Sequence, residues 1–278
     1  MTPIMERRTR PAAPSGRPRS PWAWAAAGAL LGGAVTLLWH APADWLASAV
    51  HRATAGRVVL AEARGTVWTG SARLVLTGGQ GSQNPSALPG RMDWRIRPAW
   101  PGLSVRLGAG CCTAEPVALA IAPRWGGARV QVLDSPSGPA RPTVWPSAVL
   151  AGLGAPWNTL QVEGQLSLRT RGLSVEWIEG RMSVAGSAEL IATGMSSRLS
   201  TLKPMGSYRI TLNGGNPAAL ELATLDGSLQ LAGTGQWVGS RFRFRGMATA
   251  APEREAALSN LLNIIGRRNG ARSIITVG

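Results

Sequence analysis

The stretch that decides the fold is RMDWRIR, residues 91–97. Its apolar side chains, Met92, Trp94 and Ile96, alternate with charged ones at a period of two. Strict alternation puts the apolar side chains on one face of a strand and the charged ones on the other, which is typical of an antiparallel sheet with one buried face. The same pattern recurs at residues 161–169, 208–212, 225–231 and 241–245.

Clusters of glycine and proline separate these alternating segments, at residues 78–81, 136–139, 214–215 and 233–235. Such punctuation predicts roughly a dozen short strands joined by tight turns. Residues 65–76, 164–189 and 227–244 are weakly similar to one another, either as repeated meanders or by chance among glycine-rich hairpins. We therefore expect an all-β domain that forms one elongated, curved, mainly antiparallel sheet.

Two short helices interrupt the predicted strands. Residues 145–153 end before Gly154 and are expected to form a connecting helix. Near the C-terminus, apolar residues follow helical spacing at Leu258, Leu261, Leu262 and Ile265. Gly266 stands where a helix C-cap glycine belongs. We expect this C-terminal helix to cover one open end or face of the sheet, with a last strand at residues 273–277.

The N-terminal region has the composition of a membrane anchor. Residues 20–43 carry no charged side chain, and as a helix they would extend about 36 Å, enough to cross a bilayer core. Tryptophans stand at both ends of the stretch, as membrane–water interfaces favour: Trp22, Trp24, Trp39 and Trp45.

Charge on the two sides of this stretch predicts its orientation. Residues 1–20 contain five arginines and one glutamate, which favours a cytoplasmic N-terminus. We expect a cytoplasmic Arg/Pro-rich tail at residues 1–20, a transmembrane helix at 21–43 and an exported β-rich domain at 44–278. The alternative is a signal peptide cleaved near the Ala-Ser-Ala of residues 47–49.

The composition argues against most catalytic chemistry. The chain has a formal net charge of +15 but only two histidines and two cysteines, too few for most zinc sites and histidine-based triads. Beyond residue 20 the arginines are scattered, and no run of five or six like charges forms the cluster that a nucleic-acid interface would need. No phosphate loop or dinucleotide fingerprint is present. We expect no enzyme activity, no catalytic residues, no metal or cofactor, no nucleic-acid partner and no small-molecule substrate.

The adjacent cysteines Cys111 and Cys112 are the oddest local feature. In an oxidising compartment they are candidates for a vicinal disulfide. The alternative is two inert side chains on opposite faces of a strand. A redox enzyme would need a C-x-x-C motif, which is absent.

Three stretches, in this order and spacing, resemble protein N of the type II (general) secretion pathway. They are GTVWTGSA at residues 65–72, LPGRMDWRIRP at 88–98, and GAPWNTL at 154–160 followed by GQLSL at 164–168. The residues that carry the resemblance are Gly65, Trp68, Gly70, Pro89, Gly90, Trp94, Trp157, Asn158 and Gly164. We expect Gly65 and Gly70 to permit tight turns, and Trp68 and Trp94 to lie in the core rather than to anchor a partner.

The resemblance implies an accessory component of the type II secretion machinery, held in the inner membrane of a Gram-negative bacterium with most of the chain in the periplasm. Its expected partners are other inner-membrane platform proteins, the outer-membrane secretin and inner-membrane lipid, and its role is to support protein export across the outer membrane. The family has no known catalytic residues or cofactors. A different class of function also suits the sequence: a periplasmic lipid-binding or lipid-transfer protein with a hydrophobic β-trough.

Overall fold

The computed structural model describes residues 22–78, 85–134, 142–154, 157–239 and 241–278. The predicted cytoplasmic tail at residues 1–20 therefore lies outside the described residues. The chain divides into two compact units, Met1–His40 and Ala41–Gly278. In the first unit, α1 (Trp22–Trp39) is a helix with no buried side chain. In the part of the chain that the structure describes, it is the one helix long and apolar enough to cross a membrane.

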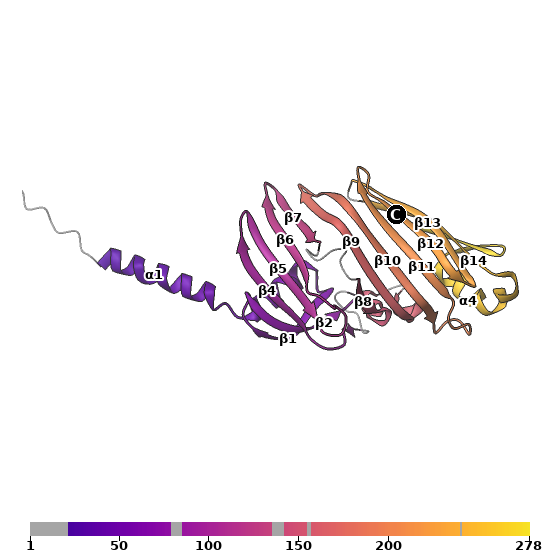
Figure 1. Cartoon of the computed structure of the whole chain (residues 1–278), viewed down its shortest axis with the longest axis horizontal. Coiled ribbons are helices and arrows are strands. Elements are labelled where there is room, and N and C mark those ends of the chain that lie inside the picture. Colours follow the sequence, from indigo (N-terminus) through magenta and orange to yellow (C-terminus); the bar gives the residue numbers. More distant parts are fainter. Residues whose placement is uncertain (1–21, 79–84, 135–141, 155–156, 240) are drawn as a thin grey trace, which may run out of the picture. The chain divides into compact units, whose positions relative to one another are not determined.

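The second unit contains one 16-stranded sheet that is antiparallel at every pairing (Figure 1). Its first strands are β1 (Val58–Gly65), β2 (Thr69–Leu76), β3 (Ser86–Ala87), β4 (Met92–Ala99), β5 (Gly102–Ala109), β6 (Val117–Arg124) and β7 (Gly127–Leu133). The others are β8 (Thr143–Pro146), β9 (Val162–Ile178), β10 (Arg181–Ser197), β11 (Gly206–Gly215), β12 (Ala219–Gly227), β13 (Leu229–Val238), β14 (Arg241–Ala250), β15 (Arg267–Asn269) and β16 (Arg272–Val277). Neighbours in the sheet are mostly neighbours in sequence, as short turns require.

The alternation that predicted the sheet is present in β4. Trp94 is buried, whereas Asp93 and Arg95 on the opposite face are exposed. The strands lie side by side in one curved sheet (Figure 1). The prediction of a single, mainly antiparallel, curved sheet is therefore confirmed.

The sheet changes partners along β9, which has 17 residues. Residues 174–178 of β9 pair with β7, whereas residues 165–168 pair with the short strand β8. Two strands thus share one side of β9, because β7 is too short to follow it over its full length. This junction joins β1–β7 to β9–β16.

The two ends of the strands differ, and we name them here. Because successive turns of a meander alternate between ends, the turns β1–β2, β4–β5, β6–β7, β9–β10, β11–β12 and β13–β14 share one end, the tip end. The connections β2–β4, β5–β6, β7–β9, β10–β11 and β12–β13, together with the C-terminal helix, lie at the other end, the helix end. The tip end has short turns only, and the helix end has the long connections.

Most buried side chains lie toward the helix end. The largest cluster includes Leu166, Met205, Tyr208, Leu229, Ala248, Leu258, Leu261 and Leu262. A smaller cluster at the helix end contains Leu88, Ala109, Cys112 and Val149. The third cluster, Ala43, Leu60, Ala72 and Trp94, lies beneath a helix on β1, β2 and β4.

The connecting helix is shorter than predicted and begins later. Trp145 and Pro146 belong to β8, because their backbone pairs with Leu166 and Gln165 of β9. Only Ser147–Leu153 turns, as the 3-10 helix η1, and a four-residue helix α3 (Trp157–Leu160) follows. The prediction that residues 145–146 are helical was therefore wrong.

The C-terminal helix α4 (Glu255–Ile265) follows the 3-10 turn η2 (Pro252–Arg254), and its side chains Leu258, Leu261 and Leu262 are buried against the sheet. Gly266 is the C-cap residue of α4, as predicted, and its backbone is extended, with φ −170° and ψ −177°. The chain enters β15 at Arg267, immediately after Gly266.

One helix was not predicted. The helix α2 (Ala43–Ala53) begins after Pro42 and packs on the face of β1 and β2. Its apolar residues recur at helical spacing: Ala43, Leu46, Ala47 and Val50. The acidic Asp44 lies in its first turn and Arg52 in its last, as the helix dipole favours. These signals were visible in the sequence.

Candidate functional site

The first two family-like stretches meet in space at the β1–β2 turn. The indole nitrogen of Trp94 donates to the backbone oxygens of Thr66, at 3.2 Å, and Val67, at 3.0 Å. Gly65 has φ 91°, which suits glycine. A Cβ on Gly70 would lie 2.5 Å from Cζ2 of Trp94. The turn glycines and Trp94, 3% exposed, therefore form one structural unit.

Trp68 is half-buried in the same turn, and its carbonyl oxygen accepts from the amide of Ile96 at 2.7 Å. Before β4, Leu88 is buried, whereas Pro89 and Gly90 are exposed. Gly90 has φ 83°, which only glycine adopts readily. These contacts hold the chain in place around Trp94.

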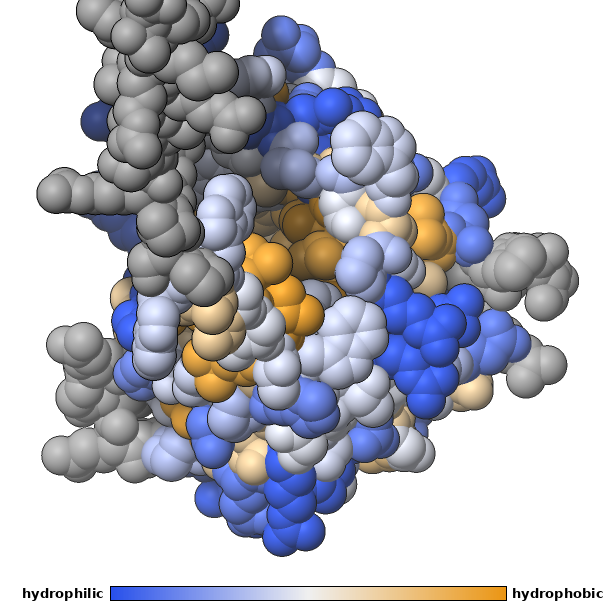
Figure 2. All heavy atoms as spheres, turned by 90° about the vertical axis from the view of Figure 1, so that its left-hand side faces the viewer, coloured by the Kyte–Doolittle hydropathy of each residue, from blue (hydrophilic) through white to orange (hydrophobic). Residues whose placement is uncertain are grey.

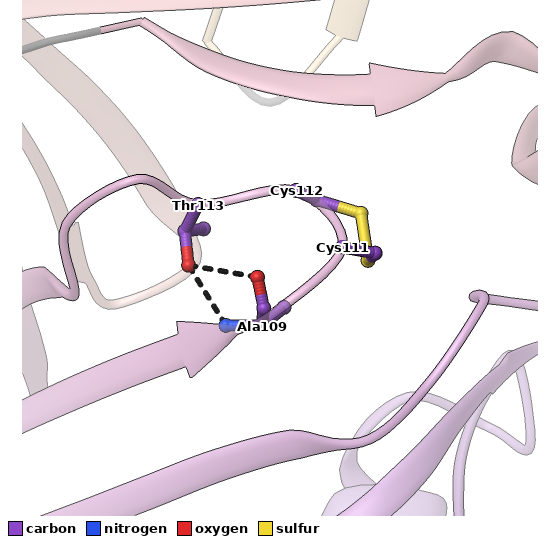
Figure 3. Close-up of a disulfide and its surroundings, with 4 residues drawn as sticks. All are labelled: Ala109, Cys111, Cys112 and Thr113. Carbon is purple, nitrogen blue, oxygen red and sulfur yellow. Dashed lines mark hydrogen bonds between the residues drawn. A yellow bond between two sulfur atoms is a disulfide. The ribbon is translucent and has the colours of Figure 1, made fainter.

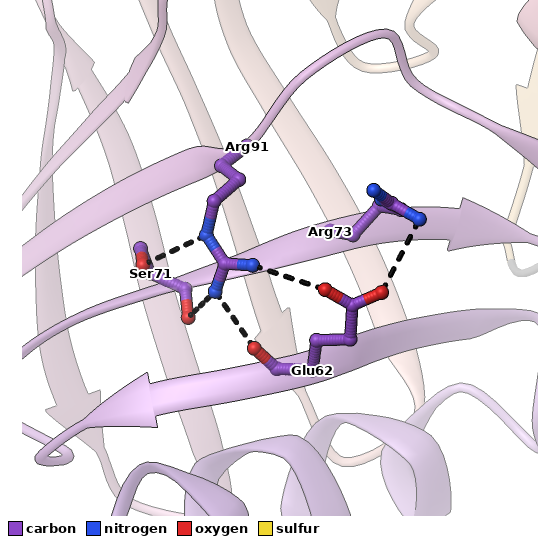
Figure 4. A network of polar contacts seen from close by, with 4 residues as sticks. All are labelled: Glu62, Ser71, Arg73 and Arg91. Atoms are coloured by element: carbon purple, nitrogen blue, oxygen red, sulfur yellow. Dashed lines mark hydrogen bonds and ion pairs between the residues drawn. The ribbon is translucent and has the colours of Figure 1, made fainter.

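Arg91, within the second family-like stretch, connects β1 to β2 (Figure 4). Its guanidinium donates to the backbone oxygens of Glu62, at 2.7 Å, and Ser71, at 3.1 Å, and to the Ser71 hydroxyl at 3.2 Å. The Glu62 carboxylate lies 3.4 Å from Arg91 and 3.2 Å from Arg73. Glu62 sits in a bulge of β1 with φ 52°, so Arg91 fixes the irregular part of this strand.

The third family-like stretch lies at the helix end, away from the β1–β2 turn where the first two meet. Trp157 is 37% exposed at the start of α3. The Asn158 amide donates to the Gly154 oxygen at 3.1 Å. Gly164, with φ 147°, lies against Met195 in β10. The structure therefore does not bring all nine family-like residues into one site.

Cys111 and Cys112 form a disulfide in the β5–β6 connection, with an S–S distance of 2.03 Å (Figure 3). Cys112 is buried in the cluster beside Leu88, whereas Cys111 is exposed. The Thr113 hydroxyl contacts both the amide nitrogen of Ala109, at 2.8 Å, and its carbonyl oxygen, at 3.1 Å. The Cys112 oxygen also accepts from the Val144 amide at 2.9 Å. The pair lies in a structural turn at the helix end.

The four anchor tryptophans fall on two helices. Trp22, Trp24 and Trp39 are exposed on α1, and Trp45 is exposed on α2, in the second unit. The apolar helix therefore ends at Trp39, before the end of the predicted span at residue 43. Whether α1 lies in a membrane stays a prediction.

In the described ranges, no group of three or more His, Cys, Asp and Glu side chains gathers to hold a metal. Burial, with Asp226 nearby, raises the pKa of Tyr208. Its hydroxyl donates to the Leu229 backbone oxygen at 3.1 Å in the largest core. Tyr208 is therefore a structural residue.

The described part of the chain has grooves on its surface. One, of roughly 540 Å³, lies over β12–β14 and contains Glu221, Arg243 and Arg245. One of roughly 390 Å³ lies at the tip end between the turns β9–β10, β11–β12 and β13–β14. A third, of roughly 410 Å³, lies beside η1.

The sheet is open and ends in two unlike edge strands. At one edge, β1 pairs with β2 only, over eight residues that include the bulge at Glu62. At the other, β15 has three residues, two of which are Arg267 and Arg268. Unpaired edges offer backbone N–H and C=O groups to another chain, and bulges, charges and short length restrict such pairing.

The face of the sheet that carries Trp94 remains apolar beyond the helices. Leu103, Ile121, Val130 and Val175 form a row in register across β5, β6, β7 and β9. Leu103 and Val130 are each 37% exposed. The main helix contacts are with β1–β3, β9 and β14–β16, away from most of this row. On the side seen in Figure 2, hydrophobic residues gather toward the middle and hydrophilic ones toward the outline.

The described part of the chain thus combines an open antiparallel sheet with an N-terminal apolar helix. The family model of type II secretion system (T2SS), protein N, matches residues 56–275. This covers most of the chain, and the protein belongs to that family, a structural family of the secretion system. No curated protein and no solved structure gives a significant match.

Sequence reasoning missed the tryptophans at the turns of the tip end. Trp100 in the β4–β5 turn and Trp125 in the β6–β7 turn are 100% and 98% exposed. Trp177, at the end of β9, is 55% exposed. The signal available was their position beside Pro101 and Gly126, residues typical of turns.

Proposed function

We propose that this protein is a membrane-anchored accessory subunit of type II secretion, which binds other platform subunits or the secretin through an edge of its sheet. The observation that carries the proposal is the open edge at β1, together with membership of the protein N family. Pairing with an edge strand supplies main-chain hydrogen bonds to a partner strand without any reactive side chain.

Of the two edges, β1 suits a partner strand better. Residues 58–61 pair with β2 in regular register before the bulge, and at the start of their outer side the Val58 amide donates to the Thr54 hydroxyl at 3.1 Å. Arg91 and Arg73 hold the bulge in place. By contrast, β15 has three residues and two arginines, which are features that discourage edge pairing.

In-cell photocrosslinking from the β1 edge tests this function. A benzoylphenylalanine is placed at Val59 in the full-length protein, and at Glu221 in the internal strand β12 as the matched control. We expect Val59 to capture identified secretion subunits and Glu221 to capture none. Equal capture from both positions, or none from Val59 and from Ala61 beside it, would contradict the proposal.

The anchor is part of the same proposal. We place residues 1–20 in the cytoplasm, α1 across the inner membrane and residues 44–278 in the periplasm, supported by the exposed apolar surface of α1. Alkaline phosphatase fused after Gly278 is expected to be active, because it folds only after export. An inactive phosphatase fusion with a fluorescent cytoplasmic reporter at the same position would overturn this topology.

A second function is favoured by the partly uncovered apolar row on β5–β9. Aliphatic side chains in register across four strands could hold an acyl chain, as a lipid carrier requires. In the described residues, α4 packs mainly against β14–β16 of the same sheet and not against this row.

Lipid bound to the purified full-length protein separates the two functions. If the row holds acyl chains, Val130→Glu removes the phospholipid that co-purifies, whereas Gln131→Glu, at the next residue of β7, leaves it in place. The same lipid content in both variants would reject a carrier. Unchanged capture of secretion subunits from Val59 in the Val130→Glu variant would support the edge as the functional surface.

A further inference from the structure

We propose that the tip end of the sheet lies against the phospholipid headgroups of the membrane, with Trp100 and Trp125 inserted at the interface and Trp177 beside them. This rests on the proposed anchor, but it concerns a surface different from the β1 edge. The occupant is the lipid bilayer surface itself.

Three neighbouring hairpins carry these tryptophans at the same end. The turns β4–β5, β6–β7 and β9–β10 follow one another in the sheet order. Adjacent hairpins are two strands apart, so their tips recur every ~10 Å. Trp100 and Trp125 are almost wholly exposed, so they contribute nothing to the core. Three large rings along one end form a row rather than isolated surface residues.

The chain enters the second unit at this same end. Ala41 is its first residue, and its carbonyl oxygen accepts from the Val67 amide at 2.9 Å in the β1–β2 turn. Pro42 pairs with Thr66 in that turn. Only His40 separates Ala41 from the end of α1. A membrane-spanning α1 therefore tethers the sheet by its tip end, not by its helix end.

The length of the hairpins suits this placement. Thr69 of β2 pairs with Arg95 of β4, and β4 continues to Ala99. These further residues carry the β4–β5 tip ~14 Å beyond the tether at the β1–β2 turn. The hairpin tips therefore extend past the point where α1 joins the sheet, and they can reach a membrane surface on that side.

Tryptophan is the residue type best suited to a membrane–water interface. Its ring is apolar and its N–H is polar, which suits the membrane–water interface. Arginines flank the tips at Arg97, Arg124 and Arg181, and acidic groups are present at Glu176 and Glu179. Arg124 pairs with Glu176 at 3.3 Å. The tryptophans, rather than a strong net charge, therefore carry the proposal.

Quenching by brominated lipid tests the contact. The full-length protein is reconstituted in phosphatidylethanolamine–phosphatidylglycerol vesicles that contain a phosphatidylcholine brominated in its acyl chains. We expect Trp100→Phe/Trp125→Phe to lower the quenched fluorescence amplitude by roughly 30%, because it removes two of seven interfacial tryptophans. The seven are the four anchor tryptophans (Trp22, Trp24, Trp39 and Trp45) and the three at the tip end (Trp100, Trp125 and Trp177). The matched control Trp145→Phe/Trp157→Phe, at the helix end, leaves that amplitude unchanged.

Two results would overturn the proposal. One is an equal quenched amplitude in the wild type and the tip variant. The other is an equal loss in the tip variant and the helix-end control. Because the α1 tryptophans report the anchor separately, an absence of all quenching in the wild type would reject the anchor as well. Far-ultraviolet circular dichroism checks that the variants are folded, as expected for substitutions in exposed turns.

Discussion

The two ends of the sheet differ in what covers them. At the helix end, α4, η1 and the long connections bury a large cluster that includes Leu258, Leu262 and Tyr208. At the tip end the turns are short, and Trp100 and Trp125 are exposed. The fold therefore concentrates its stability at one end and leaves the other available for contact. Substitutions at the helix end should affect stability, and those of the exposed tryptophans at the tip end should affect binding.

The largest expected effect on the free energy of unfolding is in α4, the helix that packs on the sheet at the helix end. Leu262→Ala removes a side chain that is 0% exposed against the sheet, so we expect a loss of about 3 kcal/mol in the free energy of unfolding. Urea unfolding of the full-length protein in mild detergent measures it. Ile264→Ala, at a position 41% exposed on the same helix, should cost less than about 0.5 kcal/mol. Similar losses in both variants would remove the basis for the comparison.

The next effect tests a tightly packed turn at the tip end, the β1–β2 turn. Gly70→Ala places a Cβ against the Trp94 ring, and we expect a loss of about 2 kcal/mol from overpacking. Gly108→Ala in β5, where a Cβ meets nothing within 4 Å, is the control. If Gly70→Ala unfolds at the same urea concentration as the control, Trp94 does not hold this turn.

A smaller effect on stability is expected at Tyr208, in the cluster at the helix end, and it depends on pH. Tyr208→Phe loses the hydroxyl bond to Leu229 and should cost about 1 kcal/mol at neutral pH. Because burial raises the pKa of Tyr208, the unfolded chain releases this proton above about pH 10 while the folded chain keeps it. The free energy of unfolding therefore falls as the pH rises above about 10, by at most about 1.4 kcal/mol per pH unit.

The pH series needs the variant as its reference. Tyr208 is the single tyrosine of the chain, so Tyr208→Phe should lack the alkaline loss assigned to this hydroxyl. Urea midpoints of both proteins, measured on either side of pH 10, give the comparison. Parallel curves would mean that Tyr208 titrates alike in the folded and unfolded chain.

The smallest effect on stability is expected at the tip end. Trp100→Ser removes a wholly exposed ring and should change the free energy of unfolding by less than about 0.5 kcal/mol. Thermal unfolding in detergent, without a lipid surface, measures this. A larger loss would show that Trp100 packs against the sheet, and the tip end would then resemble the helix end.

Local sequence patterns predicted the sheet well, because alternation in β4 or β14 reports directly which face is buried. They failed at Trp145 and Pro146, whose conformation depends on pairing with a strand about 20 residues later. The amphipathic helix α2 was missed although its spacing and its charged ends were visible.

The candidate surfaces were less accessible to sequence reasoning. The core position of Trp94 followed from its place in an alternating strand. The exposure of Trp100 and Trp125 could not be derived in this way, because turn residues have no periodicity. Their alignment at one end depends on the number and order of all the strands between them.

Hydrogen exchange of the full-length protein in lipid nanodiscs tests most directly whether the two ends have different roles. The reference is the same protein in amphipol, which shields α1 without supplying a lipid surface. We expect amides of the β4–β5 and β6–β7 turns to exchange more slowly in nanodiscs, and amides of α4 to exchange alike in both. Equal exchange at the turns in both preparations, or added protection confined to α4, would contradict the assignment of the tip end as the contacting end.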